Sequence, residues 1–388
     1  MPRAKRTEQF VAQEVCVVHV VQRCVRRAFL AGADPVSGCD YSYRKEWIRR
    51  RMEALASAFG IDVLSYAIMS NHLHLILRNR PDVVASWADE EAAIRWLKVF
   101  PGRRLEEHLG EPTEAEVQRL CRDKPRLQEI RNRLSDISWF MRALAEPIAR
   151  MANRQDDCTG RFWEGRFKAQ RIVDEAGLLA CSMYVDLNPV RAAVGDSPDC
   201  VPHTSAYDRI EAAKGKQINS AAFDLQPVPV SDASGQSLEV PAEKLRRAKK
   251  AKQRSSSGRR IRRDAWLANL SLDAGKLAND PEVHREGLRC SNSGYLNLSL
   301  REYMRLLRWT ASAGRESMRG RQSVPKDVAR ALRHRGIEAE MWSELVWNWQ
   351  RYFGRSGCAG SPKAMKADAE NSGRRWYRGQ GAVAAFFC

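Results

Sequence analysis

Two histidines separated by a single residue are the first candidates for chemistry in this sequence. His72 and His74 lie in a β-prone run, and side chains two residues apart on a strand point to the same face. Two imidazoles on a stiff strand are well placed to bind a divalent metal ion. Taken alone, such a pair is commonly no more than two histidines on a half-exposed sheet face.

A tyrosine and an asparagine four residues apart form the second candidate. On a helix, Tyr184 and Asn188 would share one face. A tyrosine hydroxyl can be a covalent nucleophile, and a carboxamide oxygen is a hard metal ligand. In isolation, a core tyrosine and a helix-ending asparagine explain the pair better, because the residue before a proline, here Pro189, is pushed away from helical angles.

The third candidate, residues 160–168, alternates cations with aromatic side chains. Cations neutralise phosphates and aromatic rings stack on bases, so this pattern suits a strand that binds nucleic acid. An edge strand with ordinary core aromatics is an equally good explanation. The candidate DNA-binding residues of this stretch are Arg161, Phe162, Trp163, Arg166 and Lys168.

The composition favours a polyanionic partner. Among 388 residues there are 65 Lys plus Arg and 47 Asp plus Glu, a formal net charge of +18, so nucleic acid ranks ahead of an acidic membrane surface. No apolar run approaches the roughly 18–20 residues of a membrane span. No export signal is found, and we expect a cytoplasmic, nucleoid-associated protein without a membrane partner. The ten cysteines include no CxxC motif, which argues against a zinc ribbon.

Strands are expected on both sides of the histidine pair. Residues 14–21 are rich in β-branched side chains and predict a buried strand. Two apolar runs, 61–69 and 72–77, surround Ser70-Asn71, and turn-prone residues between β-rich runs predict a hairpin. A further short strand is expected over 166–173.

Helices are expected between these strands. Apolar residues at spacings of three and four predict a helix over 41–59, which Gly60 would end as a C-cap glycine. A second helix begins near Ser135, a plausible N-cap, and Pro147 would kink it. The helix that carries Tyr184 is expected over 174–187, with acids at its start.

The order strand, helix, strand, strand, helices, strand, helix predicts an α+β fold, a ferredoxin-like split β-α-β antiparallel sheet with helices on one face. We expect a catalytic domain at 1–214 with a charged helical insertion at 82–134. A Ser- and Pro-containing, then strongly basic linker follows at 215–263, and a mostly helical accessory domain at 264–388. The end of the linker, 244–263, has eleven cations and no acid, and either clamps DNA or is simply solvated.

Together, the segments 69–75, 160–168 and 184–191 resemble, in sequence and order, the REP-associated tyrosine transposases, a branch of the HUH superfamily of single-tyrosine, insertion-sequence-like transposases. The resemblance covers roughly residues 10–210. It implies an enzyme that cleaves and joins single-stranded DNA at palindromic hairpins through a 5′-phosphotyrosine, without a nucleotide cofactor. A monomer or a homodimer is compatible with it.

The resemblance also implies the role of each site residue. Tyr184 would attack the phosphodiester. His72, His74 and Asn188 would bind Mg²⁺ or Mn²⁺, with Asn188 at the place where related enzymes carry Gln. Because the pKa of a free tyrosine is near 10, nearby cations such as Arg191 would help to form the phenolate.

Two other functions remain open. One is a domesticated sequence-specific DNA-binding protein of the same fold with little or no catalysis. The other is a metal-dependent hydrolase of small phosphoesters that uses the two histidines. The candidate catalytic residues are all present, which favours the transposase. A hydrolase predicts further Asp or His ligands near the pair, which we do not find, and leaves the net charge unexplained.

Overall fold

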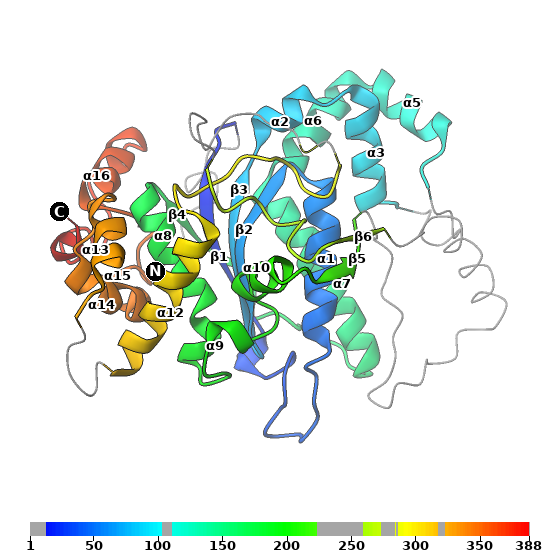
Figure 1. Cartoon of the computed structure of the whole chain (residues 1–388). Coiled ribbons are helices and arrows are strands. Elements are labelled where there is room, and N and C mark those ends of the chain that lie inside the picture. Colours follow the sequence, from blue (N-terminus) through cyan, green and yellow to red (C-terminus); the bar gives the residue numbers. More distant parts are fainter. Residues whose placement is uncertain are drawn as a thin grey trace.

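A five-stranded sheet lies between two groups of helices (Figure 1). The strand order is β2-β3-β1-β4-β7, and all neighbours are antiparallel except β4 and β7, which run parallel. The strands are β1 (Val17–Arg23), β2 (Ile61–Ile68), β3 (His72–Asn79), β4 (Lys168–Ile172) and β7 (Cys358–Ala359). The computed structural model describes residues 13–102, 111–222, 259–272, 284, 286–316 and 323–387.

One face of the sheet is covered by helices from the first half of the chain. Val18 of β1 and the leucines Leu73, Leu75 and Leu77 of β3 point to this face and share a core with α1 and α7. The helices of the predicted insertion extend the same layer. These helices are α1 (Arg44–Ala58), α2 (Pro81–Ser86), α3 (Asp89–Val99), α5 (Glu114–Arg122), α6 (Lys124–Leu134) and α7 (Ile137–Gln155).

The other face is covered by helices from the second half. Leu64, Ala67 and Ile76 point to this side and form a second core with α8 and the C-terminal helices. These helices are α8 (Glu175–Asp186), α9 (Asn188–Arg191), α10 (Ser205–Ala213), α12 (Leu300–Glu316), α13 (Lys326–Arg333), α14 (Trp342–Trp347), α15 (Trp349–Tyr352) and α16 (Pro362–Asn371).

The predicted α+β class, with a sheet dominated by antiparallel pairs, is confirmed. The expectation of helices on one face is wrong. Every residue of β2 is buried and so are all but the first of β3, so these two strands need cover on both sides. The hairpin around Ser70-Asn71 is present, closed by a hydrogen bond from the Met69 N–H to the His72 carbonyl at 2.8 Å.

Three details at the helices differ from the sequence-based expectations or refine them. Gly60 does not cap α1 in a left-handed conformation; a Cβ there would lie 2.1 Å from Val84 Cγ2, so the glycine permits close packing. The N-cap of α7 is Asp136, whose side chain accepts from two backbone N–H groups, rather than Ser135. Pro147 lies inside α7, which continues through it.

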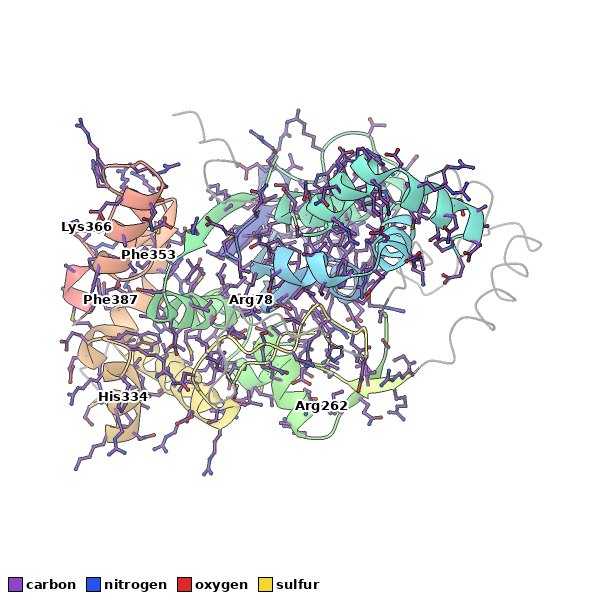
Figure 2. All side chains as sticks on the ribbon, turned by 90° about the horizontal axis from the view of Figure 1, so that it is seen from above. Arg78, Arg262, His334, Phe353, Lys366 and Phe387 are labelled. Carbon is purple, nitrogen blue, oxygen red and sulfur yellow. The ribbon has the colours of Figure 1, made fainter. Side chains whose placement is uncertain are left out.

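The C-terminal residues are joined to both edges of the sheet. At one edge β7 pairs with β4. At the other edge the Ala268 N–H donates to the Val63 carbonyl at 3.0 Å. Arg78, near the middle of the molecule in Figure 2, donates to the carbonyl oxygens of Ser293 and Gly294 at 2.8 and 2.9 Å. The C-terminal region is therefore packed onto the same sheet as the candidate site.

The predicted linker lies mostly outside the described residues, because these do not include 223–258 and hence most of the basic stretch 244–263. Its described ends pair as strands β5 (Gln217–Asn219) and β6 (Arg260–Arg262). The division into a catalytic domain, a linker and an accessory domain stays a prediction.

Among the described helices, none has the length and apolar character that crossing a membrane requires. The single-turn 3₁₀ helices are η2 (Val25–Arg27), η3 (Pro198–Cys200), η4 (Ala339–Met341) and η5 (Ala384–Phe386).

Candidate active site

The two histidines lie at the start of β3 and share a face, as predicted. The register places His72 opposite Arg23 of β1, and His74 between Val21 of β1 and Ala67 of β2. The two ring centroids are 4.9 Å apart. His74 is 2% exposed, whereas His72 is partly exposed at the end of the strand. One imidazole is therefore enclosed and the other lies at the mouth of the site.

Tyr184 on α8 and Asn188 on α9 both lie beside the His74 imidazole. Asp174 caps α8 by accepting from the Gly177 N–H at 2.7 Å, so the acid expected at the helix start is the cap. The Tyr184 ring centroid lies 5.5 Å from that of His74. The Asn188 Nδ2 lies 3.1 Å from His74 Nε2, across 114 residues of sequence. The tertiary structure thus brings the first two candidates together.

The helix is interrupted where the proline was expected to disturb it. α8 ends at Asp186 and α9 begins at Asn188, directly before Pro189. The Arg191 N–H still donates to the Leu187 carbonyl at 2.9 Å, so the turn continues and Asn188 keeps facing the sheet. Arg191, one of the predicted cations, places its guanidinium carbon 5.0 Å from the centre of the Tyr184 ring.

His19, which the sequence did not single out, completes the cluster. It lies on β1 and is 3% exposed. Its Nε2 is 3.0 Å from His74 Nδ1, and the two rings are stacked at 5.2 Å. Its ring centroid is also 5.9 Å from that of Tyr184. The available signal was a lone histidine in an apolar strand, which by itself does not distinguish a site residue from a core residue.

Burial and arginines keep these imidazoles neutral. Burial, followed by the charges of Arg23 and Arg27, lowers the pKa of His72 to about 4. Burial also lowers the pKa of His19 to about 4 and holds the pKa of His74 well below its ordinary value. The site therefore combines neutral nitrogen donors with a positively charged rim, an arrangement that suits an anionic group such as phosphate.

Tyr184 is covered by the C-terminal region. The tyrosine is 3% exposed, and Trp349 of α15 is stacked on it with ring centroids 5.8 Å apart. The exposed Gln350 donates from Nε2 to the phenolic oxygen at 2.9 Å. No local pattern in the sequence connects α15 with Tyr184.

Two of the three aromatic residues of the third candidate are buried, and the third is partly buried. Phe162 and Phe167 are 2% and 7% exposed and belong to the first core. Trp163 is partly buried and donates from Nε1 to the Ala145 carbonyl at 2.8 Å. The expectation that Phe162 and Phe167 stack on bases is wrong, because their buried rings belong to the core. For Trp163, which is partly exposed, it stays a prediction.

The cations of the same segment remain at the surface. The Val25 N–H donates to the Phe162 carbonyl at 2.9 Å, which places the segment beside the end of β1. That end of β1 is opposite the start of β3 and hence on the side of His72. Three of the predicted DNA-binding side chains are exposed in this neighbourhood: Arg161, Arg166 and Lys168.

Two further arginines at this rim were missed from the sequence. Arg26 and Arg27 of η2 are exposed and have φ values of +50° and +57°. Such left-handed angles cost a non-glycine residue about 1–2 kcal/mol. The turn is held by Asn71, whose Nδ2 donates to the Arg27 carbonyl at 3.2 Å. A strained turn with two cations therefore contacts the residue next to His72.

The cluster contains side-chain types that can bind a divalent cation. Among the described residues, no three His, Cys, Asp or Glu side chains form a metal site by themselves, so a cation on the two strand histidines would take the oxygen of the Asn188 carboxamide as a third ligand. The Asn188 atom that lies 3.1 Å from His74 Nε2 is the amide nitrogen, a donor, so the carboxamide would have to turn to present its oxygen to a cation. All three donors are neutral, so an anionic substrate would have to supply the compensating charge.

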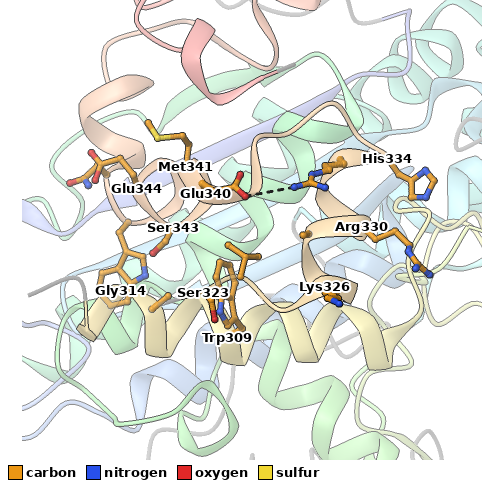
Figure 3. Close-up of a pocket in the computed structure, with 16 residues that line it drawn as sticks. Trp309, Gly314, Ser323, Lys326, Arg330, His334, Glu340, Met341, Ser343 and Glu344 are labelled. Atoms are coloured by element: carbon orange, nitrogen blue, oxygen red, sulfur yellow. Dashed lines mark ion pairs between the residues drawn. The ribbon is translucent and has the colours of Figure 1, made fainter. Parts of the chain in front are cut away.

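A large hollow lies elsewhere. A cavity of about 1630 Å³ lies between α12, α13 and α14. Its lining residues, among them Trp309, Lys326 and Arg330, are drawn in Figure 3. An ion pair between Arg333 and Glu340 crosses one side at 3.7 Å. None of the lining residues belongs to the histidine and tyrosine cluster, so size does not locate the chemistry here.

No family model and no curated protein matches the chain. Among solved structures, one match is a REP-associated tyrosine transposase bound to a REP hairpin. It is 12% identical with a TM-score of 0.31, over 62% of this chain and 100% of that chain. A match this distant assigns neither a family nor an activity, so the function has to be inferred from the residues of the site.

Proposed function

We propose that this protein is a DNA transposase that cleaves and rejoins single-stranded DNA at hairpins through a covalent bond to Tyr184. The observation that carries the proposal is the convergence of a phenol and a carboxamide on one buried imidazole. Tyr184 lies 5.5 Å from His74, ring to ring, and the Asn188 amide lies 3.1 Å from the same ring. A phenol, neutral nitrogen donors and a cationic rim are the groups that phosphodiester transfer requires.

In the cleavage step, the phenolic oxygen of Tyr184 forms a bond to phosphorus and the bond from phosphorus to the 3′ oxygen breaks. The phenol releases its proton to solvent and the leaving 3′ oxygen takes one up. The products are a 5′-phosphotyrosine and a free 3′-hydroxyl. Rejoining reverses the step with a new 3′-hydroxyl, so no nucleotide cofactor is needed.

The chain's own residues bind and orient the strand. Arg191, next to the Tyr184 ring, supplies a positive charge for the phosphate that the phenol attacks. Arg23 and Arg27, whose charges act on His72, face the phosphate backbone at the mouth of the site. The exposed cations Arg161, Arg166 and Lys168 extend the same surface along the incoming strand.

His72, His74 and Asn188 would hold Mg²⁺ or Mn²⁺, which when bound polarises the phosphate and lowers the barrier to attack. Every group named here comes from one chain, which supports a site that is complete in a monomer. A homodimer that exchanges elements would place Tyr184 of one copy beside the histidines of the other.

One observation favours the second candidate, a DNA-binding protein with little catalysis. Tyr184 is 3% exposed, stacked against Trp349 and hydrogen-bonded by Gln350. A protein that never uncovers this phenol would bind hairpins without cutting them. The two functions differ in one product, the covalent adduct of protein and DNA.

The test is an adduct assay on the full chain. A synthetic hairpin with a labelled single-stranded flank is incubated with Mg²⁺, and the adduct is separated on a denaturing gel. We expect an adduct with the natural protein and none with Tyr184→Phe. Tyr207→Phe, on α10 and outside the site, is the matched control and should retain the adduct. Hairpin binding without any adduct would support a DNA-binding protein with little catalysis. Adduct formation by Tyr184→Phe would contradict the proposed role of Tyr184.

A further inference from the structure

An amide on β4 determines which nitrogen of His19 carries a hydrogen. Gln170 donates from its Nε2 to the carbonyl oxygens of Phe353 at 2.6 Å and Ser356 at 3.0 Å, so both of its amide hydrogens are used. Gln170 lies directly opposite His19 in the register of β1 and β4, and the proximity of its amide raises the pKa of that imidazole, against the larger effect of burial. The remaining group of the Gln170 amide is the carbonyl oxygen, which only accepts. The nitrogen of His19 that faces Gln170 is therefore the N–H.

His19 in turn determines the tautomer of His74. The His19 Nε2 lies 3.0 Å from His74 Nδ1, so the nitrogen facing Gln170 is Nδ1. A neutral imidazole has one N–H, which makes His19 Nε2 an acceptor and His74 Nδ1 the donor. His74 Nε2 is then without hydrogen. The amide nitrogen of Asn188, a donor, lies 3.1 Å from that atom, which agrees with this assignment.

A second amide acts in the same way on His72. Asn71 donates from Nδ2 to the Arg27 carbonyl at 3.2 Å, which turns its Oδ1 toward the neighbouring ring. That oxygen lies 2.6 Å from His72 Nδ1. Because an amide oxygen only accepts, His72 carries its hydrogen on Nδ1 and leaves Nε2 bare. Both strand histidines thus reach the same tautomer through an amide that donates to backbone carbonyl oxygens, directly for His72 and through His19 for His74.

We propose that His19, Gln170 and Asn71 are positioning residues that hold His72 and His74 with an unprotonated Nε2, ready to bind a cation or accept a hydrogen bond. Partners of this kind raise the affinity of histidine ligands for metal by roughly 10–100-fold. The part that concerns metal rests on the proposed function; the part that concerns tautomers does not.

The C-terminal region thereby acquires a role in the site. The two carbonyls that orient Gln170 belong to Phe353 and Ser356, which follow α15. The position of these carbonyls determines the orientation of the Gln170 amide. That orientation determines the tautomer of His19, which in turn determines the tautomer of His74. The C-terminal residues act on the active site in this way without touching the substrate.

The first experiment measures the tautomers directly in metal-free protein. The full chain is labelled with ¹⁵N-histidine, and long-range ¹H–¹⁵N correlation near neutral pH distinguishes the protonated from the bare nitrogen of each ring. His72 and His74 are assigned from the signals lost in single variants. We expect both to show hydrogen on Nδ1 and a bare Nε2. Hydrogen on Nε2 of His74 in the natural protein overturns the inference, and this measurement does not require that any variant of His19 folds.

The second experiment removes the His19 nitrogen that contacts His74. In His19→Phe, which keeps a ring but no nitrogen, we expect His74 to become a mixture of tautomers and the affinity for Mn²⁺, measured by calorimetry, to fall roughly 10–100-fold. His19→Gln retains an acceptor oxygen and should restore most of both. The control is His203→Phe, at a partly exposed ring near Glu46 outside the cluster, and should change neither.

The two proposals fail in different ways. An unchanged His74 tautomer in His19→Phe contradicts the proposal that His19 positions His74. If the natural protein has the expected tautomers but binds no Mn²⁺, with or without a DNA hairpin, the positioning role stands and the metal-dependent function fails.

Discussion

Replacing Arg26 and Arg27 together by glutamine should weaken the binding of single-stranded DNA and make it less dependent on salt. Both side chains are exposed on η2, and the charge of Arg27 acts on His72. Each phosphate contact on a single strand contributes about 0.7 to the slope of log affinity against log salt, so two lost contacts lower the slope by about 1.4. Glutamine is also a non-glycine residue at a positive φ, so the strain of the turn is unchanged.

The assay is fluorescence anisotropy of a labelled hairpin with a single-stranded flank, titrated over a series of salt concentrations. The matched control is Arg119→Gln with Arg122→Gln. These two arginines are exposed on α5, in the helical layer over the opposite face of the sheet, and the change in net charge is the same. We expect the slope of the control to equal that of the natural protein.

Two results would refute the reasoning. Equal losses of slope in both double variants would mean that binding follows the total charge of +18 and not the cations around the histidines. An unchanged slope in the Arg26 and Arg27 variant, with folding verified by circular dichroism, would mean that DNA does not approach the site past η2.

Three further predictions concern stability and access. Asp62→Ala leaves Arg78 buried without the carboxylate that it pairs with at 2.8 Å, and should lower the free energy of unfolding by roughly 3–5 kcal/mol in urea titrations. Burial raises the pKa of Glu53 from 4.5 to about 7, so the folded protein holds a proton that the unfolded chain has released. The free energy of unfolding should therefore decrease by about 3 kcal/mol as the pH rises from 4.5 to about 7. Denaturation curves across pH should show no such decrease in Glu53→Gln. Gln350→Ala removes the donor to the Tyr184 oxygen and should increase the initial rate of adduct formation a few-fold; a slower rate would mean that Gln350 assists the attack.

Local patterns were sufficient to predict the elements around the site. Alternation on a strand placed His72 and His74 on one face and Leu73 on the other, because successive side chains must point to opposite sides. Acids were expected at the start of the helix over 174–187, and Asp174 is its cap, because a carboxylate satisfies the first free N–H groups. These features depend on a few neighbouring residues, which a sequence displays directly.

Patterns that serve two purposes could not be resolved from the sequence. The aromatic residues of 160–168 fit a base-stacking surface and a core equally well, and packing against the first core decided for the core at Phe162 and Phe167. Gly60 had the position of a helix cap, but the approach of Val84 is what requires a glycine there. In both cases the deciding partner lies in another element.

The chain by itself thus determined the strands and helices that carry the two strand histidines and Tyr184, the face that those histidines share, and the strongly basic character of the protein. Only the tertiary structure decided that His19 and Gln170 stand behind His74, and that Trp349 covers Tyr184. The physical reason is that strand and helix periodicity are properties of the local backbone. A hydrogen bond between side chains on different strands depends on register and packing, which arise from the whole chain.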